Sequence, residues 1–274
     1  MDLASIPVLN YFVLVSDSFI NVYADRQRAE SYARLEFPGT YSLAFRDLPR
    51  ILETHVRGRR ALDFGCGAGR STRFLRECCF HSIGADISPE MIAQAQSRDQ
   101  QGDYRLIANG DFREFETGGC DLVAAVFTFD NIPMVDKPHL LAGLGRLVAA
   151  KGRIVLIVSS PELYTHEWAS FSTARFPENW RARPGDIVRT VMKDVEDRRP
   201  VDDVYCPDSS YRAIFDLAGL DLEGIYRPLA DPCEPGAWVC ETEIPPWVVY
   251  VLARRGEQPS TLSSKTPYGR DSDL

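Results

Sequence analysis

The stretch best suited to chemistry is "ALDFGCGAGRST", residues 61–72, an apolar run that breaks into a glycine turn. Three glycines stand on alternating positions: Gly65, Gly67 and Gly69. A dinucleotide fingerprint needs glycine where Arg70 stands, and the G-K-[ST] of a nucleoside triphosphate loop is missing. Asp63 beside the turn would repel a pyrophosphate but suits a ligand with a positive group. The stretch therefore predicts close approach of the backbone to a cationic ligand.

The flanking elements must place this turn at the edge of a sheet. Apolar runs at 61–64, 81–86, 104–111, 120–129 and 152–160 alternate with segments of helical periodicity. Ser88 and Pro89 supply an N-cap and a first-turn proline for one of these helices. A helix is expected at 209–220, then strands at 221–228 and 245–255 whose short connection favours antiparallel pairing. The pattern predicts an α/β fold, a doubly wound and mostly parallel seven-stranded sheet with an antiparallel last strand.

The predicted domain organisation has four parts. Residues 1–58 form an N-terminal helical segment that covers the ligand site, and residues 59–255 form the main domain. Within it, the polar and aromatic stretch at about 161–208 shows no clean strand and follows the fifth strand, where α/β proteins place a lid. Residues 256–274 are poor in apolar side chains, so a disordered tail is expected.

Composition narrows the classes of partner. The 274 residues carry a formal net charge of −8 and no dense basic run, which disfavours a nucleic acid substrate. The apolar start is interrupted by Asp17 before it could span a membrane, so no membrane partner is expected. Seven cysteines without a C-x-x-C pair indicate a reduced, cytoplasmic protein without a metal site. A small-molecule partner is expected, and a homodimer is left open.

"LDFGCGAG" resembles motif I of the class I S-adenosylmethionine-dependent methyltransferases, and the resemblance extends from about Tyr32 to Arg254. It implies S-adenosyl-L-methionine as cofactor and S-adenosyl-L-homocysteine as product. The cofactor's ribose diol, ammonium and sulfonium groups are what nearby acids and a bare glycine backbone can accommodate. The resemblance implies that Asp86 binds both ribose hydroxyls and that Ile87 lies against the adenine.

Further cofactor contacts are implied by the same resemblance. Asp111 and Phe112 of "NGDF" would bind the adenine edge, and "FTFDNIP", which contains Phe127, would line the methionine end. Tyr41 or Arg46, from the segment before the first strand, would reach the cofactor's carboxylate.

Four of these assignments have alternatives. Asp86 would instead form an Asx turn with the residues that follow it, and Asp111 would form an ordinary turn. Asp63 would lie near the methionine moiety, through water or neighbouring backbone, or else cap the turn. Arg46 would reach the cofactor or else form a surface pair with Asp47.

The acceptor is less defined by the sequence. "FDNIP" departs from the [DN]-P-P-[FY] tetrad of adenine and glutamine N-methyltransferases, which disfavours those substrates. His166, in "SSPELYTHEW", is the candidate general base, and simple packing is its alternative role. Three functions are weighed: methyl transfer to a small metabolite or natural product, cofactor binding by a non-catalytic regulatory module, and methyl transfer to protein or RNA. A basic rim around the cleft would favour the last.

Overall fold

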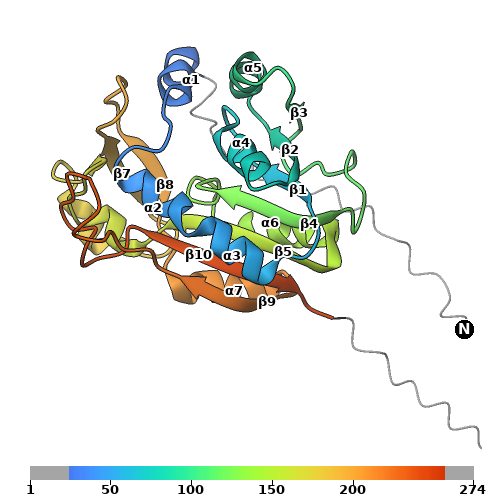
Figure 1. The fold of residues 1–274 in the computed structure, drawn as a ribbon. Helices are drawn as coiled ribbons and strands as arrows, with labels where there is room; N and C mark the ends of the chain where they lie inside the picture. The colour runs from blue at the N-terminus through green and yellow to red at the C-terminus, as the bar shows by residue number, and fades with distance from the viewer. Residues whose placement is uncertain (1–24, 257–274) are drawn as a thin grey trace, which may run out of the picture.

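The computed structural model describes residues 25–256, and its centre is a seven-stranded sheet (Figure 1). The strand order is β3-β2-β1-β4-β5-β10-β9, and β10 runs antiparallel to both of its neighbours. The strands are β1 (Arg60–Phe64), β2 (His81–Asp86), β3 (Asp103–Leu106), β4 (Cys120–Val126), β5 (Val148–Ser159), β9 (Leu220–Tyr226) and β10 (Trp247–Arg254). The predicted doubly wound sheet with an antiparallel last strand is confirmed.

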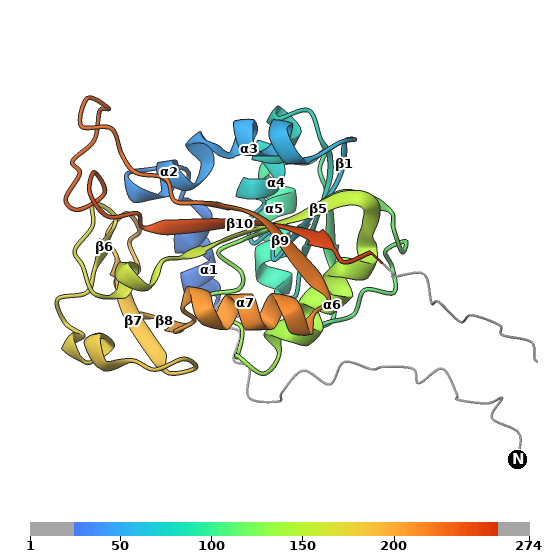
Figure 2. The same cartoon turned by 90° about the horizontal axis from the view of Figure 1, so that it is seen from below.

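Helices cover both faces of this sheet (Figure 2). They are α1 (Arg26–Ala33), α2 (Thr40–Arg46), α3 (Leu48–His55), α4 (Arg70–Glu77), α5 (Pro89–Arg98), α6 (Lys137–Leu147) and α7 (Asp208–Leu217). Helices α2, α3 and α4 pack on one face, whereas α6 and α7 pack on the other. A hydrophobic cluster lies on each face of the sheet. Val249 and Val251 of β10 belong to the first cluster, beneath α2 and α3, and Val248 and Tyr250 belong to the second, beside α6 and α7. Because both faces of β10 are buried, its sequence is continuously apolar.

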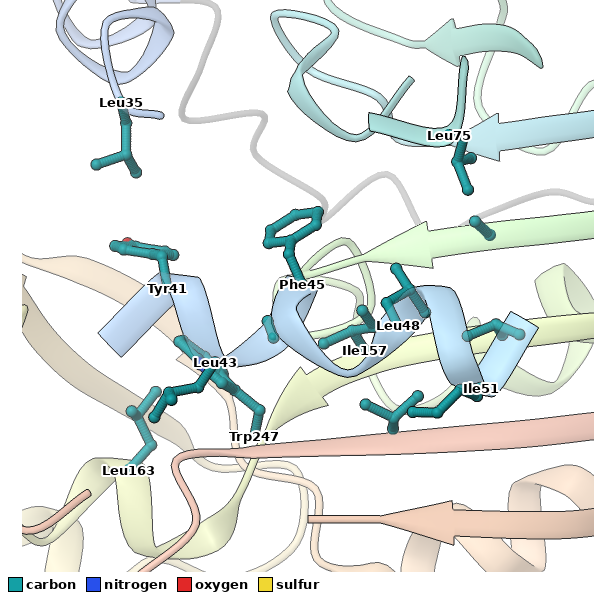
Figure 3. Packing of buried hydrophobic residues seen from close by; sticks show 14 of the residues in the cluster. Leu35, Tyr41, Leu43, Phe45, Leu48, Ile51, Leu75, Ile157, Leu163 and Trp247 are labelled. Carbon is teal, nitrogen blue, oxygen red and sulfur yellow. The ribbon is translucent and has the colours of Figure 1, made fainter. Parts of the chain in front are cut away.

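The first of these two clusters lies between the N-terminal helices and the sheet (Figure 3). Phe45 of α2 and Leu48 and Ile51 of α3 are each at most 3% exposed and lie above β5 and β10. This packing holds α2 next to the carboxyl end of β4 and the start of β10. The described part of the N-terminal segment is therefore mainly helical.

The insertion after β5 contains strands, which corrects the expectation that it has none. Strands β6 (Phe171–Ser172), β7 (Ile187–Met192) and β8 (Val201–Val204) form a separate antiparallel sheet. Short 3-10 helices at Pro161–Tyr164 and Pro177–Arg181 precede β6 and β7. Strand β8 has the sequence "VDDV", and aspartate is depleted in strands, so local composition concealed it.

Helix α1 is tied to the turn between β7 and β8 by charged groups. Arg28 contacts Asp197 at 3.3 Å, and both side chains are largely buried. Arg199 bonds Asp25 through two nitrogens at 3.0 and 3.2 Å, and the Asp197 amide donates to Ser31 Oγ at 3.0 Å. The N-terminal segment and the insertion are thereby joined to each other.

Some predictions fall outside the described residues. The apolar start and most of the predicted disordered tail lie in 1–24 and 257–274. Across residues 25–256 no helix has the length and apolar character needed to span a membrane.

Candidate functional site

The glycine turn after β1 has three left-handed residues with different reasons for lacking a side chain. Gly65, Gly67 and Gly69 have φ values of 72°, 53° and 79°. A Cβ on Gly65 would lie 2.3 Å from the Thr128 side chain, and one on Gly69 would lie 2.6 Å from the Tyr104 hydroxyl. A Cβ on Gly67 would meet nothing within 4 Å. Packing thus requires glycine at 65 and 69, whereas Gly67 presents bare backbone to open space.

Asp86, at the end of β2, connects this turn to the neighbouring strand. Its carboxylate accepts from the Gly67 amide and from the Ser88 amide, both at 2.8 Å. It also lines the main cavity, which extends from the glycine turn to the insertion sheet. Burial raises the pKa of Asp86, and the amide hydrogen bonds oppose that shift. A carboxylate can accept about four hydrogen bonds, so Asp86 retains acceptor capacity toward the cavity.

Asp63 is directed into the protein rather than into this cavity. It is fully buried, and the Ser71 and Thr72 hydroxyls both donate to Oδ2 at 2.6 Å. Oδ1 has no hydrogen-bond partner among residues 25–256, and burial raises the pKa of Asp63 to about 6. The geometry supports the alternative role of Asp63: it fixes the turn to the first residues of α4.

The cavity extends from the glycine turn to the insertion sheet and holds about 1200 Å³ of space between atoms, part of it open to solvent. One end is lined by Gly65, Gly67, Asp86 and Ile87. The other end is lined by side chains of β7 and β8. The glycine turn and the insertion sheet therefore face one continuous space.

An aromatic wall, defined as Tyr41, Phe127, Phe171 and Trp247, forms part of the lining of the cavity. The Phe127 ring lies 4.5 Å from Trp247 and 5.7 Å from Tyr41, measured between centroids. Figure 3 shows Tyr41 of α2 above Trp247 at the start of β10. Phe127 has a φ of 60°, which costs energy for a residue with a side chain, and its amide donates to Ile157 O at 2.8 Å.

Two buried carboxylates line the far end of the cavity. Asp130 follows β4 and accepts from the Ser159 amide at 3.1 Å. Asp203 of β8 accepts from Asn131 Nδ2 at 2.6 Å and from the Tyr164 hydroxyl at 3.2 Å. The Val204 amide donates to Asp130 O at 2.7 Å, which joins the two segments. Asp130 and Asp203 are 6% and 7% exposed, and we call them the acid pair.

The charges around the acid pair do not cancel. Burial raises the pKa of both carboxyls, and the Asp130 charge raises that of Asp203 further. Lys137 of α6 opposes these shifts, but its ammonium is fully buried, bonds the Phe129 carbonyl and does not line the cavity. The face of this cluster that meets the cavity is therefore acidic.

Several predicted site residues do not line the cavity. Asp111 is paired with Arg113 at 2.9 Å, and Phe112 packs into the core 5.7 Å from Phe64. Arg46 is bound by Asp47 at 3.0 Å and Glu234 at 2.9 Å, which is the surface-pair alternative.

His166 is also outside the cavity. Its Nδ1 lies 3.1 Å from both Thr165 Oγ1 and Glu162 O, and its ring lies 5.8 Å from Trp180. The geometry favours the packing role over the predicted general base.

The sequence interpretation missed Arg70 and the acid pair. Arg70 is 8% exposed, and its guanidinium carbon lies 5.1 Å from the Tyr41 ring and 5.9 Å from the Phe127 ring. It donates to Glu36 O at 2.6 Å and lines a hollow that shares Gly65 and Gly67 with the main cavity. Arg70 was noticed only as a missing glycine; its position directly after the turn was the available signal.

Comparisons with known proteins agree with this geometry. A family model described as "Methyltransferase domain" matches residues 32–222. The ubiquinone biosynthesis O-methyltransferase of Methylococcus capsulatus is 25% identical over 165 residues, covering 52% of this chain and 68% of that protein. The mouse 18S rRNA (guanine-N(7))-methyltransferase is 40% identical over 68 residues, which is 24% of either chain. DesVI of Streptomyces venezuelae shares the fold, with a TM-score of 0.59, 16% identity, and coverage of 84% of this chain and 98% of that one.

Proposed function

The chain belongs to the class I S-adenosylmethionine-dependent methyltransferases. We propose that its cavity binds S-adenosylmethionine beside a small-molecule acceptor, which receives the methyl group. The family establishes a methyltransferase and its cofactor. The acceptor class and the residue roles are the proposal. The matched curated relatives include a ubiquinone-pathway enzyme and rRNA enzymes, so they leave the acceptor open.

The residues around the glycine turn fit the nucleoside part of the cofactor. Asp86 has spare acceptor capacity for the ribose hydroxyls, and the open side of Gly67 leaves space beside it. Ile87 and Ile107 line the same end and offer apolar contact to the adenine. Asn109 lines this end where Asp111 was expected, and its amide can both donate to and accept from a base edge.

The methionine part of the cofactor fits the hollow beside Arg70. A guanidinium has five N–H donors, and the two hydrogen bonds of Arg70 to Glu36 and Tyr32 leave capacity for a carboxylate. Arg70 thus takes the role first assigned to Arg46. The sulfonium would then lie toward the aromatic wall, whose ring faces attract cations.

The acidic lining of the acceptor end, the part of the cavity beside the acid pair, is the observation that carries the small-molecule assignment. The aromatic wall and the insertion sheet border this space, and its buried charges are carboxylates. A phosphate backbone would be repelled by the acid pair, and RNA binding requires a basic surface. This acidic lining favours a small-molecule acceptor over RNA.

The reaction mainly requires that the acceptor be aligned with the methyl group of the cofactor. The acceptor attacks the methyl carbon in line with the departing sulfur, so the sulfonium charge disappears as the new bond forms. The protein holds both molecules in contact and excludes water. The contacts between α1 and the β7–β8 turn support this role, because they join the two segments that border the cavity.

Calorimetry and methyl-label transfer test the proposal. S-adenosylmethionine should bind at one site per chain, and NAD should not bind. With labelled cofactor, label should appear in the low-molecular-mass fraction of a metabolite extract, and total RNA should stay unlabelled under the same conditions. Labelling of RNA without labelling of small molecules would reject the assignment.

A further inference from the structure

With both carboxyls ionised, the acid pair and Lys137 leave one negative charge uncompensated among the described residues. When both carboxylates are ionised they carry two negative charges, and Lys137 is the cation that acts on both of them. Buried charge without compensation is costly, so the cluster must take up a proton or accept a cation. Asp130 and Asp203 line the cavity while Lys137 does not, so a cation from the cavity can reach the carboxylates directly.

The surrounding groups also favour a cation. The hydrogen bonds to the acid pair from Ser159, Asn131 and Tyr164 each leave carboxylate lone pairs unused. The aromatic wall lines the same cavity, and aromatic faces next to carboxylates are the usual surroundings of a bound ammonium ion. A neutral alcohol would leave the charge deficit in place, and a carboxylate ligand would increase it.

We propose that the methyl acceptor is an amine that enters as an ammonium ion, and that the acid pair binds this ion and receives its proton at Asp203. The inference rests on the proposed function and specifies its acceptor. Asp203 is assigned the proton because the charge of Asp130 raises the pKa of Asp203, whereas the charge of Lys137 is the main influence that lowers the pKa of Asp130.

The proton and electron balance is complete. The ammonium gives one proton to the Asp203 carboxylate and becomes a neutral amine. The nitrogen lone pair then forms a bond to the methyl carbon, while the C–S bond breaks and its electron pair stays on sulfur as a neutral thioether. The positive charge passes from sulfur to the methylated nitrogen, and Asp203 later releases its proton to solvent.

Three probes of one shape test the charge preference: phenethylamine, phenethyl alcohol and phenylacetate. Binding to the protein saturated with S-adenosylhomocysteine can be followed by tryptophan fluorescence, since Trp247 lines the cavity. A charge-assisted contact predicts that phenethylamine binds about tenfold more tightly than phenethyl alcohol. Phenylacetate should bind most weakly. Equal binding of amine and alcohol, a preference for phenylacetate, or no binding of any probe would overturn the inference.

Asp203→Asn should abolish the preference for the amine and leave the affinity for S-adenosylmethionine unchanged. Asp202→Asn is the matched control: it removes the same charge one residue earlier, but Asp202 is half exposed and paired with Arg189 at 2.9 Å. This control should keep the full preference, and a loss as large as that of Asp203→Asn would contradict the assignment. If Asp203→Asn fails to bind the cofactor, the wild-type probe series alone decides. Failure of the wild-type protein to bind S-adenosylmethionine would instead reject the proposed function.

Discussion

The two ends of the cavity are built in different ways. The cofactor end takes Gly65, Gly67, Asp86 and Ile87 from loops that follow two adjacent parallel strands. The acceptor end brings together Asp130 and Asp203, which are far apart in the chain. Asp130 follows β4 of the seven-stranded sheet, and Asp203 lies in β8 of the three-stranded sheet. The first end follows from a repeated strand and turn geometry, while the second depends on where an insertion packs. The proposed cofactor end and the proposed acceptor end thus depend on different parts of the structure.

The largest expected effect is at the cofactor end. Asp86→Ala should weaken S-adenosylmethionine binding at least about 150-fold, because two charge-assisted hydrogen bonds to the ribose are lost. Asp111→Ala is the matched control, since Asp111 pairs with Arg113 outside the cavity. Calorimetric titration of both variants decides. Comparable losses in both would show that the nucleoside lies along the loop after β3 instead.

Substitution of Asp63 should change the free energy of unfolding without changing cofactor affinity. Its pKa is about 6 in the folded protein against 3.8 for an ordinary aspartate, so the folded state retains a proton that the unfolded state loses between these values. The Asp63 contribution to the free energy of unfolding should therefore fall by about 3 kcal/mol as the pH rises from about 4 to 6, and stay constant above. Urea unfolding of wild type and Asp63→Asn across this range measures the difference. A flat difference, or a loss of cofactor affinity in Asp63→Asn as large as that in Asp86→Ala, would contradict this role.

Substitutions of Arg70 and of Arg46 should show which of these two arginines binds the methionine carboxylate. Arg70→Met should weaken S-adenosylmethionine binding about 20-fold through loss of a charge-assisted contact. Arg46→Met should leave it unchanged, because Arg46 is held by Asp47 and Glu234. Melting temperatures of both variants control for folding. The opposite ranking would restore the original assignment of Arg46.

Alanine substitutions at two glycines of the turn should differ in their effects on cofactor affinity and on melting temperature. Gly67→Ala should weaken cofactor binding about tenfold, since its Cβ occupies the open face beside Asp86. Gly65→Ala should instead lower the melting temperature, since its Cβ would overlap Thr128. Binding and thermal unfolding of the pair separate the two effects. Unchanged cofactor affinity in Gly67→Ala would place the ligand away from this face.

The smallest effect is expected at His166. His166→Gln should change the rate of methyl transfer less than about twofold at any pH, because the imidazole packs against Trp180 outside the cavity. The measurement is the pH profile of the turnover rate with an amine acceptor. A profile that loses its alkaline or acidic limb in this variant would make His166 the proton acceptor after all.

The sequence alone determined the fold, and it predicted the residues of the proposed cofactor end. Apolar runs and glycine turns are local signals, and parallel strands bring their carboxyl ends to one edge, so the sequence pattern alone places Gly67 and Asp86 together. The side-chain directions were not determined. Asp63 and Asp111 stand in the expected motifs, yet one is directed into the core and the other toward Arg113.

Only the tertiary structure decided the acceptor end. Asp203 stands in "VDDV", where nothing local distinguishes it from Asp202. The alternation of β8 buries one aspartate and exposes the other, and the hydrogen bond from Val204 to Asp130 brings the buried one to the cavity. Burial, and not residue type, gives these carboxyls their chemistry, and burial is a property of long-range packing.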